Sequence, residues 1–355
     1  MSKPKIGGIL QVGIGVTDMP QARSWYHKNL HFSAQVLEEK TIAGLMKAYT
    51  GGMAHERQAA IVMNMSGAGG LEVWQYLSRE PKLPKKPIQL GDLGTFCIKL
   101  KTPDIHRAHK ILKHLSPSAI EEGISGKLSF TFSDPYRNFF QVIEGVGYFE
   151  KPKTTSGVYG AIVGCSDLEK SIAFYTDVLG YELQRAIESD IPKELSSLPG
   201  AEGRFNRAWL TKPVAEIGGF SKFLGNTEIE LIQSLDRTGI KIYEDRYWGD
   251  PGFIHICFDV RDMDALKAHC KLKGFPFVLD SFETEEGESF NMGEVTSRVA
   301  YIDDPDGTAI EFVETHKVPV IPSLGLSINL QGNDSNKDVP TWLLKLIKIK
   351  KVKNG

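Results

Sequence analysis

The chain has 355 residues, of which 41% are hydrophobic and 24% are charged, and its formal net charge is −2. This composition is typical of a globular protein, and the near-neutral balance excludes the strongly basic surface that nucleic acids or anionic membranes attract. Because one domain commonly holds about 100–200 residues, the length predicts at least two domains.

Two segments, residues 11–32 and 160–181, repeat one pattern. In each, an apolar run leads to an aspartate that can cap a helix, and apolar residues at helical spacing follow. The pattern predicts a strand and then a helix. The matched pairs are Gly15 with Gly164, Asp18 with Asp167, Tyr26 with Tyr175, and Leu30 with Leu179.

Runs with a period near two follow each of these helices. They lie at residues 59–65 and 70–77 after the first helix, and at 207–212 and 227–235 after the second. Gly, Asn and Ser residues separate them, as is typical of strands joined by turns.

A second kind of unit follows each of the first. Residues 95–115 lead to 130–145, and residues 255–275 lead to 298–315. The dipeptides Asp134-Pro135 and Asp304-Pro305 each open a turn before a final strand. The chain therefore holds four strand-helix-strands units.

A single unit would expose one apolar face of its sheet, so we expect the units to pair. We predict domains at residues 7–149 and 157–318, joined by the polar linker 149–157. The tail, residues 319–355, holds a short basic amphipathic helix from Trp342 onward. We expect this helix to pack on the protein body, because short isolated helices are marginally stable.

This layout resembles the vicinal oxygen chelate superfamily, which includes glyoxalase I, extradiol dioxygenases and bleomycin-resistance proteins. The resemblance covers nearly all of residues 8–316 and is clearest at residues 11–26, 160–181 and 255–266 and in the sequence DDPDGTAIEFVE at 303–314. It implies an α+β fold in which four βαβββ units form two glyoxalase-like domains with cup-shaped mixed sheets.

The resemblance also implies a divalent metal held by residues of the first and last strands of each unit. The first-strand positions are Gln11, Thr95, Gly160 and His255, and the last-strand positions are Glu72, Gln141, Glu230 and Glu311.

Two pairings of the units are possible. If neighbours pair, the second half offers only Glu230, His255 and Glu311, and the first half offers no imidazole. If the outer units pair, Gln11, Glu72, His255 and Glu311 form a full set, which resembles the ligand set of some glyoxalase I enzymes. We favour this pairing. One imidazole with oxygen donors suits Zn, Ni, Co, Mn or Fe(II).

An ordinary structural explanation exists for each of these residues alone. Glu72 and Glu311 could be solvated residues on half-exposed strands, and His255, between two isoleucines, could be a core histidine. Their coincidence with four family positions favours a metal site.

The resemblance implies a metal-dependent lyase or isomerase that transfers a proton next to a carbonyl, with Glu72 or Glu311 as the base. One alternative is an iron(II) extradiol dioxygenase, although Gly160 stands where that family's site has a histidine. Another is a metal-free module that binds a small molecule. We expect a small-molecule substrate, no nucleic acid, no membrane insertion, and a monomer or homodimer.

Other sequence features bear on the cellular location of the protein and on where it binds its substrate. The chain shows no signal-peptide pattern, and the four cysteines lack zinc spacing, which predicts free thiols and a cytoplasmic protein. Candidate substrate loops are residues 51–58, 189–206 and 236–251. Candidate anion-binding residues are Arg57, Arg204, Arg246 and Arg298.

Overall fold

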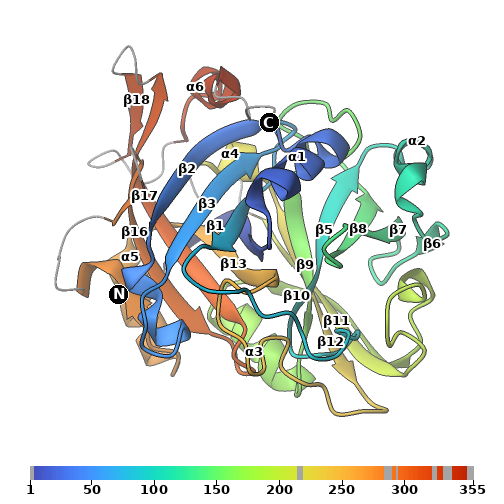
Figure 1. The fold of residues 1–355 in the computed structure, drawn as a ribbon. Helices are drawn as coiled ribbons and strands as arrows, with labels where there is room; N and C mark the ends of the chain where they lie inside the picture. The colour runs from blue at the N-terminus through green and yellow to red at the C-terminus, as the bar shows by residue number, and fades with distance from the viewer. Residues whose placement is uncertain are drawn as a thin grey trace.

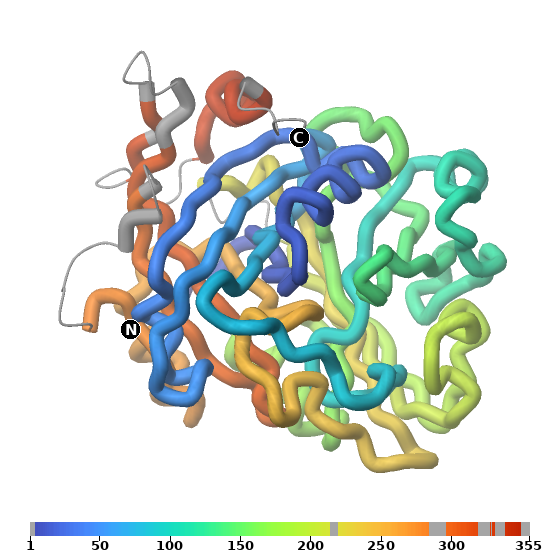
Figure 2. Tube along the Cα trace, viewed as in Figure 1, coloured from blue at the N-terminus to red at the C-terminus, as the bar shows by residue number. Residues whose placement is uncertain are grey.

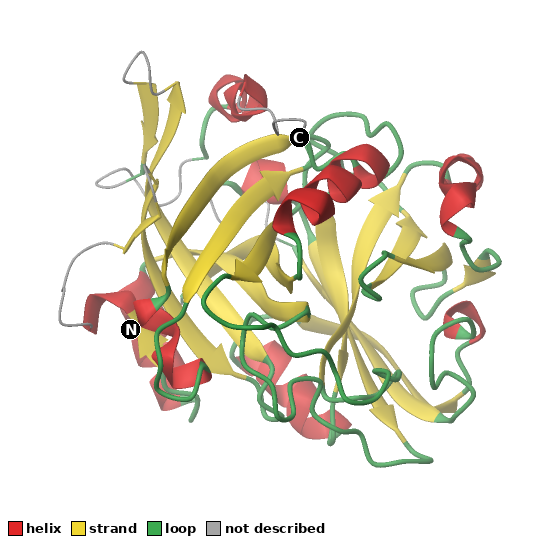
Figure 3. Ribbon diagram, in the orientation of Figure 1, coloured by secondary structure: helices red, strands yellow, loops and turns green. Residues whose placement is uncertain are grey.

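The computed structural model describes residues 4–213, 219–283, 290–292, 295–321, 326–330 and 338–349. Two curled mixed sheets dominate it, and short helices lie around them (Figures 1 and 3). This architecture confirms the predicted α+β fold with two glyoxalase-like sheets. In the described ranges, no helix has the length and apolar character needed to cross a membrane.

The first sheet has the strand order β14-β16-β17-β13-β1-β4-β3-β2, with β15 paired to β16 and β18 paired to β17. The bounds are β1 Lys5–Gly15, β2 Ala34–Ile42, β3 Glu56–Met63, β4 Gly70–Tyr76, β13 Gly252–Arg261, β14 Leu279–Asp280, β15 Phe290–Met292, β16 Val295–Asp303, β17 Ala309–Ile321 and β18 Leu326–Asn329.

The second sheet has the order β10-β11-β12-β9-β5-β8-β7-β6. Its strands are β5 Gly94–Thr102, β6 Glu121–Glu122, β7 Leu128–Ser133, β8 Phe139–Glu144, β9 Val158–Gly164, β10 Glu182–Asp190, β11 Phe205–Lys212 and β12 Thr227–Ser234.

Each sheet combines one unit from each half of the chain. Strand β1 pairs antiparallel with β13, and β5 pairs antiparallel with β9, so the two outer units share one sheet and the two inner units share the other. The sheets therefore do not follow the predicted ranges 7–149 and 157–318. Periodicity shows that a unit needs a partner to bury its apolar face, but it does not show which unit that partner is.

The four main helices begin where the sequence predicts. Helices α1 (Met19–Leu30), α2 (Ile105–Ile111), α3 (Leu168–Asp177) and α5 (Met263–Leu272) each follow an aspartate whose side chain accepts a hydrogen bond from a first-turn backbone N–H. The shorter helical segments are η1 Gly44–Tyr49, η2 Leu112–Leu115, η3 Lys193–Leu195, α4 Ser221–Leu224, η4 Ser281–Glu283, α6 Thr341–Leu346 and η6 Ile347–Ile349.

The repeated tyrosines connect neighbouring units. Tyr26 donates a hydrogen bond to Asp134 at 2.6 Å, and Tyr175 donates one to Asp304 at 3.4 Å. Both aspartates open the Asp-Pro turns of the next unit in the chain, which lies in the other sheet. These buried contacts tie the two sheets together around one apolar core.

The described part of the tail packs on the first sheet. Leu344 of α6 is fully buried against Phe220 and Phe223, and η6 contacts β2 and β17. Figure 2 shows the red tail returning beside the blue first strands. The tail helix therefore packs on the body of the protein.

Candidate metal centre

Four side chains converge from four adjacent strands of the first sheet, β17-β13-β1-β4. They are Gln11 of β1, Glu72 of β4, His255 of β13 and Glu311 of β17. The register explains the convergence, because Gly13 is the partner of both His255 and Glu72, while Cys257 is the partner of both Gln11 and Glu311. These are the four residues of the outer-unit set.

The four side chains are close together and buried. Nε2 of His255 lies 3.0 Å from Oε2 of Glu311 and 3.4 Å from Oε2 of Glu72. Nε2 of Gln11 lies 3.4 Å from Glu72 and 3.5 Å from Glu311. One ligand atom from each of Glu72, His255 and Glu311 lies within 4.8 Å of the others. Buried, mutually close carboxylates rule out the interpretation of Glu72 and Glu311 as solvated strand residues.

A glycine makes room for the imidazole. A Cβ added to Gly13 would lie 2.5 Å from Cε1 of His255, which is far inside van der Waals contact. Glycine at this position therefore leaves the space that the His255 ring occupies.

Aromatic side chains surround the imidazole. The hydroxyl of Tyr301 donates a hydrogen bond of 2.8 Å to Oε1 of Glu311 and lies 3.4 Å from Nδ1 of His255. The ring of Trp248 stacks on that of His255 with centroids 5.7 Å apart and planes 12° apart. Trp248 belongs to the candidate loop 236–251. Tyr301 was not predicted, because only the pairing of β16 with β17 places it opposite Glu311.

Burial and charge act on the two carboxyl groups differently. Burial raises the pKa of Glu72, and the attraction of His255 does not cancel this effect. Burial also opposes ionisation of Glu311, but His255 and hydrogen bonds from Cys257 and Tyr301 prevail and lower its pKa. The pKa of His255 is raised because its two carboxylate neighbours outweigh its burial.

The donor set fits a divalent cation. Although Oε2 of Glu311 is 3.0 Å away, Nε2 of His255 makes no hydrogen bond of acceptable angle within the described residues. A buried imidazole nitrogen that faces two carboxylate oxygens is arranged as a borderline metal requires. A half-turn of the Gln11 amide would direct Oε1, in place of Nε2, toward the same point.

The corresponding place in the second sheet holds two cationic side chains. Glu230 accepts hydrogen bonds from Nζ of Lys99 at 2.7 Å and from Nη2 of Arg207 at 2.6 Å, and Lys99 also binds Glu228 at 2.9 Å. Burial alone would raise the pKa of Glu230, but the two cations lower it to about 2. Lys99 and Arg207 were not predicted from the sequence.

The other inner positions are dispersed. Nε2 of Gln141 donates to Ser129 at 3.2 Å, and Gly160 has no side chain to offer. Cys97, not Thr95, occupies the pairing position that corresponds to His255, so the assignment of Thr95 was wrong. Over the ranges that can be described, the only cluster of potential metal ligands is that of Glu72, His255 and Glu311.

All four candidate anion-binding arginines have partners. Arg204 pairs with Asp236, Arg298 pairs with Asp280, and Arg246 donates to backbone carbonyls. Arg57 pairs with Glu39 and lies over the Trp74 ring, 4.6 Å from its centroid. Arg57 also lines a small hollow beside Glu72 and Glu311, so it is the candidate arginine that reaches the centre.

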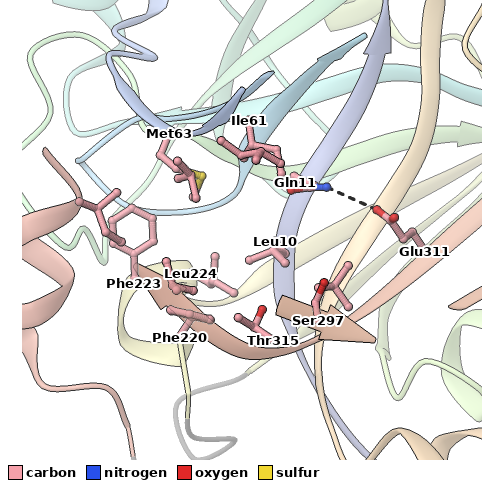
Figure 4. A pocket seen from close by; sticks show the side chains of 15 residues that line it. Leu10, Gln11, Ile61, Met63, Phe220, Phe223, Leu224, Ser297, Glu311 and Thr315 are labelled. Carbon is pink, nitrogen blue, oxygen red and sulfur yellow. Dashed lines mark hydrogen bonds between the residues drawn. The ribbon is translucent and has the colours of Figure 1, made fainter. Parts of the chain in front are cut away.

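A larger cavity adjoins the other side of the centre. Gln11 and Glu311 lie at one end of it, and Phe223 and Met63 lie at the far end (Figure 4). Its volume is about 90 Å³. The centre is therefore buried but borders space that a small molecule could fill.

Known proteins resemble this chain in sequence and in fold. A family model described as the Glyoxalase/Bleomycin resistance protein/Dioxygenase superfamily matches residues 160–312. The "Probable lactoylglutathione lyase" of Synechocystis sp. is 28% identical over 154 residues, which are 43% of this chain and 92% of that protein. The lactoylglutathione lyase of Neisseria meningitidis is 28% identical over 148 residues, 42% of this chain and 83% of that protein.

A solved structure extends the likeness to most of the chain. Glyoxalase I from Zea mays matches with a TM-score of 0.54 at 15% identity, covering 86% of this chain and 92% of that one. At this identity the likeness concerns the fold. Residues 160–312 therefore match the glyoxalase/bleomycin resistance protein/dioxygenase superfamily, the group also called vicinal oxygen chelate proteins, and the four repeated units and the crossed sheets give most of the chain a glyoxalase-like fold.

Proposed function

We propose that this protein is a metal-dependent lyase or isomerase that transfers a proton next to the carbonyl of a small substrate. One observation carries the proposal: Gln11, Glu72, His255 and Glu311 converge from both ends of the chain on one buried point. Placing two carboxylates there without a cation would be costly, which supports a bound metal.

Gln11, Glu72, His255 and Glu311 would hold the metal, which supplies Lewis-acid polarisation of the carbonyl oxygen when bound. Zn, Ni, Co, Mn and Fe(II) all suit this donor set. Tyr301 fixes Glu311 through its hydrogen bond, and Trp248 holds the plane of the His255 ring.

Glu72 is the better candidate for the base. Glu311 is held by Tyr301 at 2.8 Å, whereas the hydrogen bond described for Glu72 is the long one from Gln11 at 3.4 Å. Burial raises the pKa of Glu72, which makes its carboxylate a stronger proton acceptor. Glu72 would take the proton from the carbon next to the carbonyl and return it to the neighbouring carbon.

The names of the relatives support this class of reaction. Both relatives are called lactoylglutathione lyases, which is consistent with a lyase that acts on a small carbonyl compound. The donor set disfavours the dioxygenase alternative, because only one imidazole is present in the cluster.

The test is turnover of 2-oxoaldehydes, alone and as hemithioacetals with several thiols, by protein loaded in turn with each metal. We expect turnover without oxygen uptake, and its loss in Glu72→Gln with metal retained. Stoichiometric oxygen uptake with a catechol would favour the dioxygenase. A protein that binds small molecules yet takes up no metal would favour the binding module.

A further inference from the structure

We infer that the substrate of this centre carries an apolar alkyl or aryl substituent, which lies in the cavity bounded by β1, β3, β17 and α4. The inference rests on the proposed function for the centre itself, because it assigns the cavity to that substrate. It adds the substrate class, which the relatives' names do not give.

The wall of the cavity is apolar except at the metal centre and one edge. Gln11 and Glu311 border the centre, and Ser297 and Thr315 contribute hydroxyl groups. The other lining side chains are aliphatic, aromatic or thioether groups, as Figure 4 shows around Phe223, Met63 and Leu224. Among the described lining residues there is no lysine, arginine or histidine.

Segments from outside the first sheet cover the cavity. Phe223 and Leu224 belong to α4, in the connection between β11 and β12 of the second sheet, and Ile347 belongs to the tail. Phe223 and Leu224 are 3% and 1% exposed, because Leu344 of the tail packs in the same cluster. The cover is thus built and held in place by apolar contacts, which favours an apolar occupant.

Charged substituents do not suit this space. The peptide part of a glutathione adduct carries two carboxylates and an ammonium group, and burying these without partners would strongly disfavour binding. An alkyl or aryl group would gain from the same burial, since each buried methylene improves affinity roughly three- to fourfold.

The size of the cavity limits the substituent. An apolar cavity of about 150 Å³ holds a benzene molecule, so a cavity of about 90 Å³ accepts about four non-hydrogen atoms. This corresponds to a butyl chain or to part of an aryl ring.

Two matched ligand series test the inference by calorimetry on the metal-loaded protein. The first is n-alkyl hydroxamic acids, which chelate metals, from two to ten carbons. The second is the corresponding primary amides, which carry the same tails without the chelating group. We expect affinity to rise roughly three- to fourfold per methylene in both series until the cavity is full, and then to stay level.

Variants locate the effect. Ile61→Trp fills the cavity from β3 and should weaken binding of the butyl hydroxamate at least tenfold, with little change for the two-carbon member. Phe223→Ala enlarges the cavity, so the affinity should continue to rise to longer alkyl chains before it becomes constant. Leu183→Trp, at an exposed leucine of β10, is the control for adding a tryptophan and should bind like the unaltered protein.

The two series separate failure of this inference from failure of the proposed function. If the hydroxamates bind tightly but their affinity does not depend on chain length, the inference is wrong and the proposed metal centre is supported. If the hydroxamates bind no more tightly than the amides but affinity still rises with chain length, the proposed metal centre is wrong and the apolar cavity is supported.

Discussion

The amide nitrogen of Gln11 lies 3.5 Å from Oε2 of Glu311, although the two residues are 300 positions apart in the chain. This contact exists because β1 and β17 both flank β13 in one sheet. The candidate metal centre therefore forms only when the first and last units have paired. The metal affinity should therefore depend on the pairing of these two units as well as on the four ligand residues.

Removing the Tyr301 hydroxyl should weaken metal binding without removing a ligand. Tyr301→Phe deletes the 2.8 Å hydrogen bond to Glu311, and partners of this kind typically contribute about 10- to 100-fold in metal affinity. Competition with a chromogenic chelator would measure the change. Tyr49→Phe is the matched control, because Tyr49 bonds Asp303 at 2.9 Å; an equal loss in both variants would contradict a specific role for Tyr301.

A methyl group at Gly13 should displace the imidazole. Gly13→Ala places a Cβ 2.5 Å from the His255 ring, so we expect at least a tenfold loss of metal affinity in a folded protein. Gly44→Ala is the control, since a Cβ there meets nothing within 4 Å. Calorimetric titration with metal measures both. Unchanged affinity in Gly13→Ala would show that the ring can move without cost.

Metal affinity should rise with pH. Burial raises the pKa of Glu72, and the two carboxylates raise that of His255, so both groups hold protons that a metal must displace. Affinity should fall as the pH falls through these pKa values, and proton release on binding should be smaller in Glu72→Gln. Titrations in buffers of different ionisation enthalpy measure the released protons. Affinity independent of pH between about 5 and 8 would contradict this assignment.

The charge cluster of the second sheet should stabilise the fold without binding metal. Glu230→Gln leaves Lys99 and Arg207 with fewer buried partners and should lower the free energy of unfolding by about 3 kcal/mol. The pKa of Glu230 is about 2, below the ordinary value of about 4.3, so its stabilisation is complete above that ordinary value and is lost as the pH falls toward 2.

Urea unfolding at several pH values checks this prediction. The difference between the unaltered protein and Glu230→Gln should shrink between about pH 4 and pH 2. Glu188→Gln, at an exposed glutamate of β10, should have little effect at any pH. A large effect of Glu188→Gln, or none of Glu230→Gln, would contradict the proposed role of the cluster.

The repeated pattern predicted the fold, and the family resemblance supplied the ligand positions within each unit. Asp18 and Asp167 mark the same helix start in two units, and this common frame located the implied positions at Gln11, Glu72, His255 and Glu311. The prediction was wrong in the second unit, where an extra residue was allowed before the helix and Thr95 was chosen. Cys97 precedes the capping Asp104 by the same spacing that separates His255 from Asp262, so the sequence already held the correct position.

The residues missed were those whose role depends on the partner strand. Lys99 and Arg207 lie in strands whose alternation allows a charged residue to point outward, and only the fold places both against Glu230. Tyr301 is likewise positioned by the pairing of β16 with β17. From the sequence, Arg57 was one of four equivalent candidates for binding an anionic group. In the structure, the other three arginines have partners that lie away from the centre.

The most direct test of the account is the metal content of the purified protein after reconstitution and desalting. We predict about one divalent metal per chain in the unaltered protein, almost none in His255→Ala and Glu311→Ala, and an unchanged content in Glu230→Gln, with circular dichroism showing that all four are folded. Retention of metal by folded His255→Ala, or its loss from folded Glu230→Gln, would contradict a centre built from the two outer units.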